Sequence, residues 1–188
     1  TSQVVDADRR VTLGGVDLHS WVTNAAGFNF HNWYGFGKVD ADLAVAAAAI
    51  FDQALLGTQS YQERLAEFTT PVQIPNAEGR SASINLTAGA GTLGIVEFIR
   101  LKIKFSASQA VALNDIGITL TSPSGTTHSV LQPFTNVSGQ PSFYWAIGVA
   151  GFYGETIEGD WEVTVFDYSD DAISPGTWDG FELEVHYR

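Results

Sequence analysis

The 188-residue sequence contains neither cysteine nor methionine, and it has only nine lysine and arginine residues. The absence of cysteine excludes disulfide bonds, thiolate metal sites and cysteine nucleophiles. Because there is no methionine, Thr1 is not an initiator position, and we expect a processed product or fragment from which any export signal has been removed. No apolar run approaches the roughly 20 residues that a membrane-spanning helix needs.

Basic residues are scarcest in the second half of the chain. Between Lys104 and Arg188 there is no lysine or arginine, whereas eleven aspartates and glutamates occur there, and the net charge of the whole chain is −12. A surface of this sign repels nucleic acid and anionic lipid, so we expect neither a nucleic-acid partner nor a membrane partner. The same charge favours solubility and suits the binding of cations.

Residues up to about Gly57 have the pattern of a loop followed by a helix. The stretch SWVTNAAGFNFHNWYGFG (20–37) is aromatic and glycine-rich and predicts a packed loop. In DADLAVAAAAIFDQALLG (40–57) the apolar spacing predicts one helix, with Asp40 at its start and Gly57 at its end. Its expected buried face comprises Leu43, Ala46, Ala47, Ile50, Phe51, Ala54 and Leu55. Such a piece has no core of its own, so it must cover another surface.

Beyond Gly57 the pattern changes to short β-branched and aromatic segments separated by turn residues. In 161–165 and 181–185 apolar residues alternate with polar ones, as in strands with one buried face. No helical period occurs there, so the expected fold is mainly β, an antiparallel jelly-roll β-sandwich with a short N-terminal helical segment. The expected strands lie near Ser83–Leu86, Val96–Phe105, Ile116–Thr121, His128–Leu131, Phe143–Val149, Trp161–Tyr168 and Gly180–Tyr187.

Several motifs in this second half carry a family resemblance. NDIGITL (114–120) and TSPSGTTHSVL (121–131) are followed in order by FYWAI (143–147), GFYGE (151–155), GDWEVTVFD (159–167) and GTWDGFELEV (176–185). Together they resemble the P domain that follows the catalytic domain in kexin-like and furin-like proprotein convertases, which are subtilisin-like serine peptidases. WVTNAAGFNFHNWYGFGKVDADLAVAAA (21–48) resembles the closing stretch of the catalytic domain in such peptidases, where YGFGKVDA leads into a terminal helix.

The resemblance implies a domain division and a role. Residues 1–57 would be the tail of a subtilisin-like catalytic domain, and residues 58–188 the P domain. The implied protein is a secreted serine endopeptidase, and the implied partner is its catalytic domain, which this chain would stabilise or regulate. The chain itself is not expected to be an enzyme, because the Ser, His and Asp motifs of a subtilase are absent from it. Its histidines, His19, His31, His128 and His186, have no nucleophile motif nearby.

Acidic turns offer a candidate calcium site. Candidate ligands are Asp115 before a strand, Glu155 in GFYGE, and Asp167, Asp170 and Asp171 in the turn after another strand. Hard oxygen ligands on loops, without lysine or arginine nearby, are what Ca²⁺ requires. The alternative is that these residues form solvated turns, since the aspartate side chain bonds the backbone two residues on.

Two other classes of function remain open. A jelly-roll carbohydrate-binding or adhesion module would use exposed aromatic side chains, and exposure of Trp145 and Tyr153 in one groove would favour it. The five tryptophans, Trp21, Trp33, Trp145, Trp161 and Trp178, are nevertheless expected at core positions. An independent hydrolase with an unfamiliar set of catalytic residues would need a serine hydroxyl within hydrogen-bond reach of a histidine.

Overall fold

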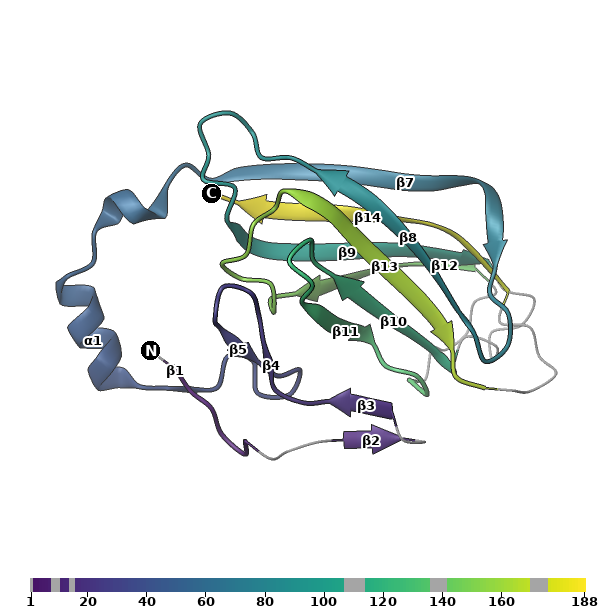
Figure 1. Ribbon diagram of the computed structural model, residues 1–188, viewed down its shortest axis with the longest axis horizontal. Helices are drawn as coiled ribbons and strands as arrows, with labels where there is room; N and C mark the ends of the chain where they lie inside the picture. The colour runs from purple at the N-terminus through teal and green to yellow at the C-terminus, as the bar shows by residue number, and fades with distance from the viewer. Residues whose placement is uncertain (1, 8–10, 14–15, 107–113, 136–141, 170–175) are drawn as a thin grey trace.

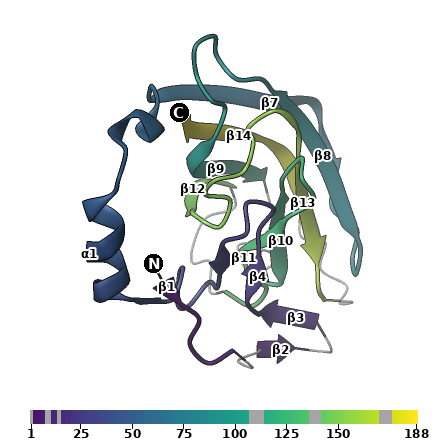
Figure 2. The ribbon, with the colours of Figure 1, turned by 60° about the vertical axis from the view of Figure 1, so that its left-hand side comes forward.

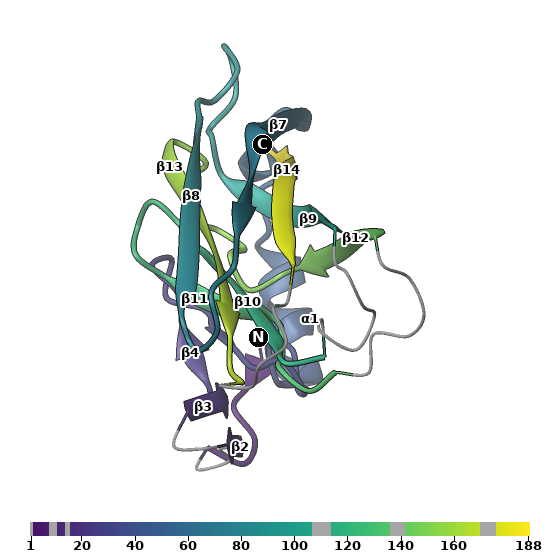
Figure 3. The same ribbon diagram turned by 90° about the vertical axis from the view of Figure 1, so that its right-hand side faces the viewer.

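The computed structural model describes residues 2–7, 11–13, 16–106, 114–135, 142–169 and 176–188. Its main body is a sandwich of two four-stranded antiparallel sheets, seen in Figure 1 and side by side in Figure 3. The first sheet has the order β11 (Thr127–Leu131), β10 (Ile116–Thr121), β13 (Gly159–Asp167) and β8 (Gly79–Leu86). The second has the order β12 (Ser142–Val149), β9 (Val96–Ser106), β14 (Thr177–Tyr187) and β7 (Ser60–Gln73).

Successive strands mostly cross from one sheet to the other. β7 pairs with β14, β8 with β13, β9 with β14 and β12, and β10 with β13 and β11, all antiparallel. Eight strands wound in this way form a jelly roll, so the expected fold class is confirmed. The seven strands expected from the sequence are all present and extend one to four residues beyond the expected bounds at some ends, whereas β13 ends at Asp167, one residue before the expected end.

The core lies between the two sheets and is built by alternation. On β9, Ile99, Leu101, Ile103 and Phe105 point inward and are fully buried. The inward-facing residues of β13 and β14 pack against them. One of these residues, Trp161, donates its indole N–H to the Ile157 carbonyl at 2.9 Å. A buried indole paired in this way contributes apolar area without leaving a polar atom unsatisfied.

The N-terminal part consists of three short two-stranded ribbons and a helix. The ribbons pair β1 (Ser2–Gln3) with β6 (Lys38–Val39), β2 (Val11–Leu13) with β3 (Val16–His19), and β4 (Val22–Thr23) with β5 (Asn29–Phe30). The α-helix α1 spans Ala41–Ala49, and a 3₁₀ turn spans Gln53–Leu56. Figures 1 and 2 both show α1 separated from the sheets.

The expectation of one helix reaching Gly57 with a buried face is wrong. Asp40 caps the start, since its Oδ1 accepts the Leu43 N–H at 3.0 Å, but α1 ends at Ala49. Asp52 then caps a separate 3₁₀ turn by accepting the Ala54 N–H at 2.9 Å. No residue of α1 is buried, because within the described part of the chain its apolar side chains have no surface to cover.

Candidate functional site at the junction of the N-terminal part and the sandwich

Residues 19–37, which we call the docking loop, attach the N-terminal part to the sandwich. The loop turns back on itself at Asn24, where the Asn24 N–H donates to the Phe28 carbonyl at 2.9 Å. The Asn24 side-chain Oδ1 accepts the Ala26 and Phe28 N–H groups at 3.1 and 2.9 Å. Asparagine forms such turns because its side chain bonds backbone groups a few residues ahead.

Asn24 also bonds the docking loop to the sandwich. Its Nδ2 donates to the Gly151 and Tyr153 carbonyls, both at 2.9 Å, in the turn that follows β12. The side chain therefore makes four hydrogen bonds, two local and two to a turn some 130 residues away, while only 3% exposed. An amide has two donors and one acceptor oxygen with two lone pairs, so all of its bonding capacity is used.

Glu155 provides a second attachment in the same turn. Its Oε1 accepts the Ala25 N–H at 2.9 Å and the Thr126 hydroxyl, and the residue is buried. Its Oε2 is buried without a hydrogen-bond partner. Burying a carboxylate is costly unless donors satisfy it, so the docking loop contributes one of the donors that keep Glu155 in place.

An aromatic layer fills the junction around these polar contacts. Tyr153 packs edge-on against Phe28 and Phe36, with ring centroids 5.2 and 6.0 Å apart. His128 lies between Phe30 and Phe152, at 5.3 and 4.9 Å. Burial lowers the pKa of His128, which favours the neutral imidazole in this apolar setting. The packed loop expected from the sequence is thus present and covers the end of the sandwich.

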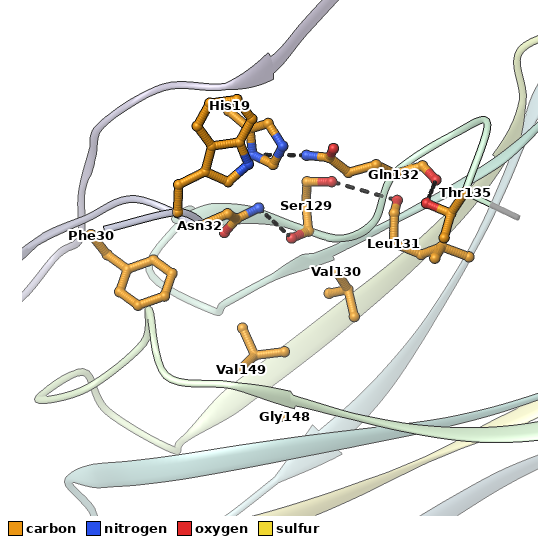
Figure 4. A pocket seen from close by; sticks show the side chains of 11 residues that line it. His19, Phe30, Asn32, Ser129, Val130, Leu131, Gln132, Thr135, Gly148 and Val149 are labelled. Carbon is orange, nitrogen blue, oxygen red and sulfur yellow. Dashed lines mark hydrogen bonds between the residues drawn. The ribbon is translucent and has the colours of Figure 1, made fainter. Parts of the chain in front are cut away.

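Beside this layer the docking loop and the sandwich form an open pocket of about 340 Å³, the junction pocket (Figure 4). From the docking loop it is lined by His19, Phe30, Asn32 and Trp33, and from β11, β12 and the turn after β11 by Ser129, Val130, Leu131, Gln132, Thr135, Gly148 and Val149. A smaller hollow of about 180 Å³ adjoins it and shares His19, Asn32 and Ser129.

The positions of the tryptophans correct part of the sequence interpretation. Trp161 and Trp178 are core residues as expected, whereas Trp33 and Trp145 are 50% and 36% exposed and Trp21 is half-buried, so these three are not in the core. Tyr153 lies under Phe28 and Phe36, and neither Tyr153 nor Trp145 lines the junction pocket. The pairing of these two side chains that would have favoured a carbohydrate module is therefore not found there.

Among the described candidate calcium ligands, Glu155 lies apart from Asp115 and Asp167. Ile116, next to Asp115, pairs with Asp167 across β10 and β13, and the Tyr168 N–H donates to the Asp115 carbonyl at 3.1 Å. Glu155 precedes β13, whereas Asp167 ends this nine-residue strand, which spans roughly 26 Å. Asp170 and Asp171 lie outside the described residues. Among the described residues no group of three or more acidic or histidine side chains could hold a metal ion.

A network of ion pairs covers the outer face of the second sheet. The Lys102 ammonium donates to Glu182 and Glu63 at 2.5 and 2.6 Å and lies 3.3 Å from Glu184. Arg100 and His186 approach Glu184 at 3.1 and 3.2 Å. The bonds to Glu182 and Glu63 raise the pKa of Lys102, and the bond from Lys102 lowers the pKa of Glu63 from 4.5 to about 2. These charges are compensated within the sheet face.

Comparison with known protein families identifies a part of the chain. Residues 97–185 match the family described as the proprotein convertase P-domain. This stretch is a P domain. It contains six of the eight sandwich strands in full or in part, together with Thr126 and Glu155 of the junction. The resemblance inferred from the motifs is confirmed.

Relatives of the P domain extend the match to the N-terminal part. Proprotein convertase subtilisin/kexin type 5 of Rattus norvegicus is 28% identical over 167 residues, 85% of this chain and 9% of the relative. The extracellular serine protease of Aeromonas sobria is 28% identical over 171 residues, 80% of this chain and 25% of the relative. This chain therefore spans a quarter or less of either relative.

A solved structure shares the fold. The Aeromonas sobria serine protease, in a crystal structure of its complex with a chaperone, has a TM-score of 0.78 and 21% identity, covering 100% of this chain and 38% of that one. At this identity the likeness shows the fold alone. No helix in the described part of this chain is long and apolar enough to cross a membrane.

Proposed function

We propose that this chain is the non-catalytic C-terminal part of a secreted subtilisin-like serine endopeptidase. The observation that carries the proposal is the P domain itself, with an N-terminal segment docked on it through Asn24 and Glu155. In this proposal residues 1–57 are the tail of the catalytic domain and residues 58–188 the P domain. The alignments with protease relatives support it, because they cover more of the chain than the P-domain match.

The exposed apolar residues around α1 support the proposal that a catalytic domain is the partner of this chain. Large side chains from Val39 to Leu56 lie open to solvent, among them Ile50 at 86% exposure. A monomeric protein rarely exposes such a group of apolar side chains unless they form an interaction site. We infer that they pack against the catalytic domain. The docking loop, which is hydrogen-bonded to the sandwich, would then connect the catalytic domain to the sandwich. The extracellular protease among the relatives supports secretion.

The role would be to stabilise the catalytic domain. The experiment compares the longer protease with a form that lacks residues 58–188, measuring melting temperature and peptide hydrolysis. The proposal predicts that removal lowers the melting temperature of the catalytic domain and its activity. An equally stable and active truncated protease would show that the P domain serves another purpose.

A further inference from the structure

The junction pocket has the size of a small-ligand site and walls from two separate parts of the chain. At about 340 Å³ it lies at the lower end of the range for ligand pockets. Figure 4 shows His19, Phe30 and Asn32 on one side, with Ser129 to Gln132 and Thr135 on the other. A ligand here would contact the docking loop and the sandwich at once.

The residues that line the pocket favour an uncharged ligand. The chain has 21 acidic and nine basic residues, yet among the described residues no aspartate, glutamate, lysine or arginine lines the pocket. Its polar side chains are two amides, Asn32 and Gln132, two hydroxyls, Ser129 and Thr135, and the imidazole of His19. A charged ligand would lose hydration without gaining an opposite charge, whereas a neutral polar ligand exchanges water for amide and hydroxyl partners.

Several of these polar groups are held in place before any ligand arrives. The Asn32 Nδ2 donates to the Ser129 carbonyl at 3.0 Å, which ties the docking loop to the edge strand β11. The Gln132 Nε2 lies 2.8 Å from His19 Nδ1, and the Thr135 hydroxyl donates to the Gln132 carbonyl at 2.7 Å. Preorganised side chains lose less entropy when they bind a ligand.

Trp33 supplies an aromatic face to the pocket, beside the amides and hydroxyls of its polar side chains. Its ring centroid lies 4.9 Å from that of His19, so the indole is supported, yet half of the residue is exposed. An indole beside amides and hydroxyls suits a ligand with one apolar face and a rim of hydroxyl groups. A pyranose ring has this construction: its C–H groups stack on an aromatic face while its hydroxyls bond to amides.

We propose that the junction pocket binds one ring of a neutral saccharide, stacked on Trp33 and hydrogen-bonded by Asn32 and Gln132. The site is distinct from the proposed stabilising role and does not depend on it. The ligand contacts both the docking loop and the sandwich, so it binds only when the loop is attached. Binding therefore also stabilises the attachment of the docking loop to the sandwich.

The test is saturation-transfer NMR and calorimetry on the 188-residue chain with methyl glycosides of glucose, galactose, mannose and N-acetylglucosamine, and their neutral trisaccharides. A single ring is expected to bind with a Kd on the order of millimolar. Glucosamine and glucuronate, which have the same ring with a charge, serve as matched ligands and are expected to bind less tightly than glucose.

Variants locate the site. Trp33→Ala should weaken binding about tenfold or more, and Gln132→Ala should weaken it severalfold. Trp145→Ala, which changes an exposed tryptophan on β12 that does not line the pocket, should leave binding unchanged. Circular dichroism melting establishes that each variant is folded before its affinity is compared.

Three outcomes would overturn the assignment. The first is that no neutral saccharide binds, and the second is that binding survives Trp33→Ala but not Trp145→Ala. The third is that acetyl-trialanine amide, an uncharged peptide, binds in the Trp33-dependent manner when no saccharide does, which would make the pocket a peptide site.

Discussion

At the scale of single residues, Lys102 is the centre of the ion-pair network on the second sheet, because its ammonium contacts Glu63, Glu182 and Glu184. Its side chain is 15% exposed, and its ammonium compensates Glu182 and Glu184, whose side chains are 15% and 9% exposed. Lys102→Met would leave these carboxylates without their partner. We expect a loss of about 2–3 kcal/mol in the free energy of unfolding at pH 7, somewhat below the cost of breaking a fully buried pair. Lys104→Met, on the same strand and exposed, is the control and should cost about 0.5 kcal/mol or less.

The effect of Lys102→Met on the free energy of unfolding depends on pH. The pKa of Glu63 falls from 4.5 to about 2 in the folded chain, chiefly through its bond from Lys102. A lowered pKa stabilises the fold above the ordinary value, and this contribution is lost as the pH falls from about 4.5 to 2. The stability gap between wild type and Lys102→Met should therefore narrow over this range. A gap that stays constant in urea melts at pH 5, 3.5 and 2.5 would contradict the assigned network.

Core residues could be predicted from the sequence, but the junction residues could not. Alternation in GDWEVTVFD and GFELEV places Trp161, Val163 and Val165, and Phe181, Leu183 and Val185, on one face, and all six are buried. Asn24 and Glu155 have no periodic signal. Each acts through a partner some 130 residues away, and only the fold brings such partners together.

At the scale of structural elements, Asn24 determines whether the docking loop stays attached. Asn24→Ala removes two bonds to the turn after β12 and two that shape the loop, leaving buried carbonyl and N–H groups unsatisfied. We expect a loss of about 2–4 kcal/mol in junction stability, given ~1–3 kcal/mol for each unsatisfied group. Hydrogen exchange should become fast in residues 24–36, while β9 and β14 stay protected.

A matched asparagine provides the control for this result. Asn85 also donates from its side chain, to Asp160 at 2.8 Å, but on the exposed side of the sandwich. Asn85→Ala should leave the exchange of residues 24–36 unchanged. If Asn24→Ala also leaves it unchanged, the loop is held by the aromatic layer and not by the asparagine.

The largest strand missed by sequence patterns is β7. Its sequence SYQERLAEFTTPVQ places Tyr61, Glu63 and Leu65 on the exposed side, so the face pattern of a half-buried strand is lost, and Pro71 argues against a central strand. β7 lies at the edge of its sheet and pairs with β14 through ten register positions. Pairing with a distant strand, which no local pattern reveals, therefore determines this element.

The region around α1 gives another prediction for an element. Ile50→Asp should leave the melting temperature of the 188-residue chain within roughly 2 °C, because an exposed substitution changes stability by about 0.5 kcal/mol or less. Ile103→Ala, in the core, should cost about 2–5 kcal/mol. In the longer protease Ile50→Asp should lower the yield of active enzyme, since it places a charge in the inferred contact with the catalytic domain. A protease unaffected by it would remove this region from the contact.

At the scale of the whole molecule, the net charge of −12 suits the binding of cations, and calcium binding stays a prediction. The Asp167 Oδ1 accepts the Ser169 N–H at 3.0 Å, the bond of a turn-forming aspartate, which favours the turn interpretation for that residue. Calcium binding at Asp115, Asp167, Asp170 and Asp171 would raise the melting temperature by about 5–10 °C at a concentration near 100 times the Kd, and a chelator would reverse the rise. An unchanged melting curve would leave these aspartates as turn residues only.

The central claim is that this chain is the non-catalytic part of a serine protease, and reaction with a fluorophosphonate probe tests it most directly. His19, His31 and His186 are hydrogen-bonded to the Gln132 amide, the Trp33 backbone N–H and Glu184, none of which is a serine hydroxyl. The account predicts that the probe leaves the 188-residue chain unlabelled, whereas the longer protease is labelled at one serine preceding Thr1. Covalent labelling of a single serine within residues 1–188, abolished by prior denaturation, would contradict it.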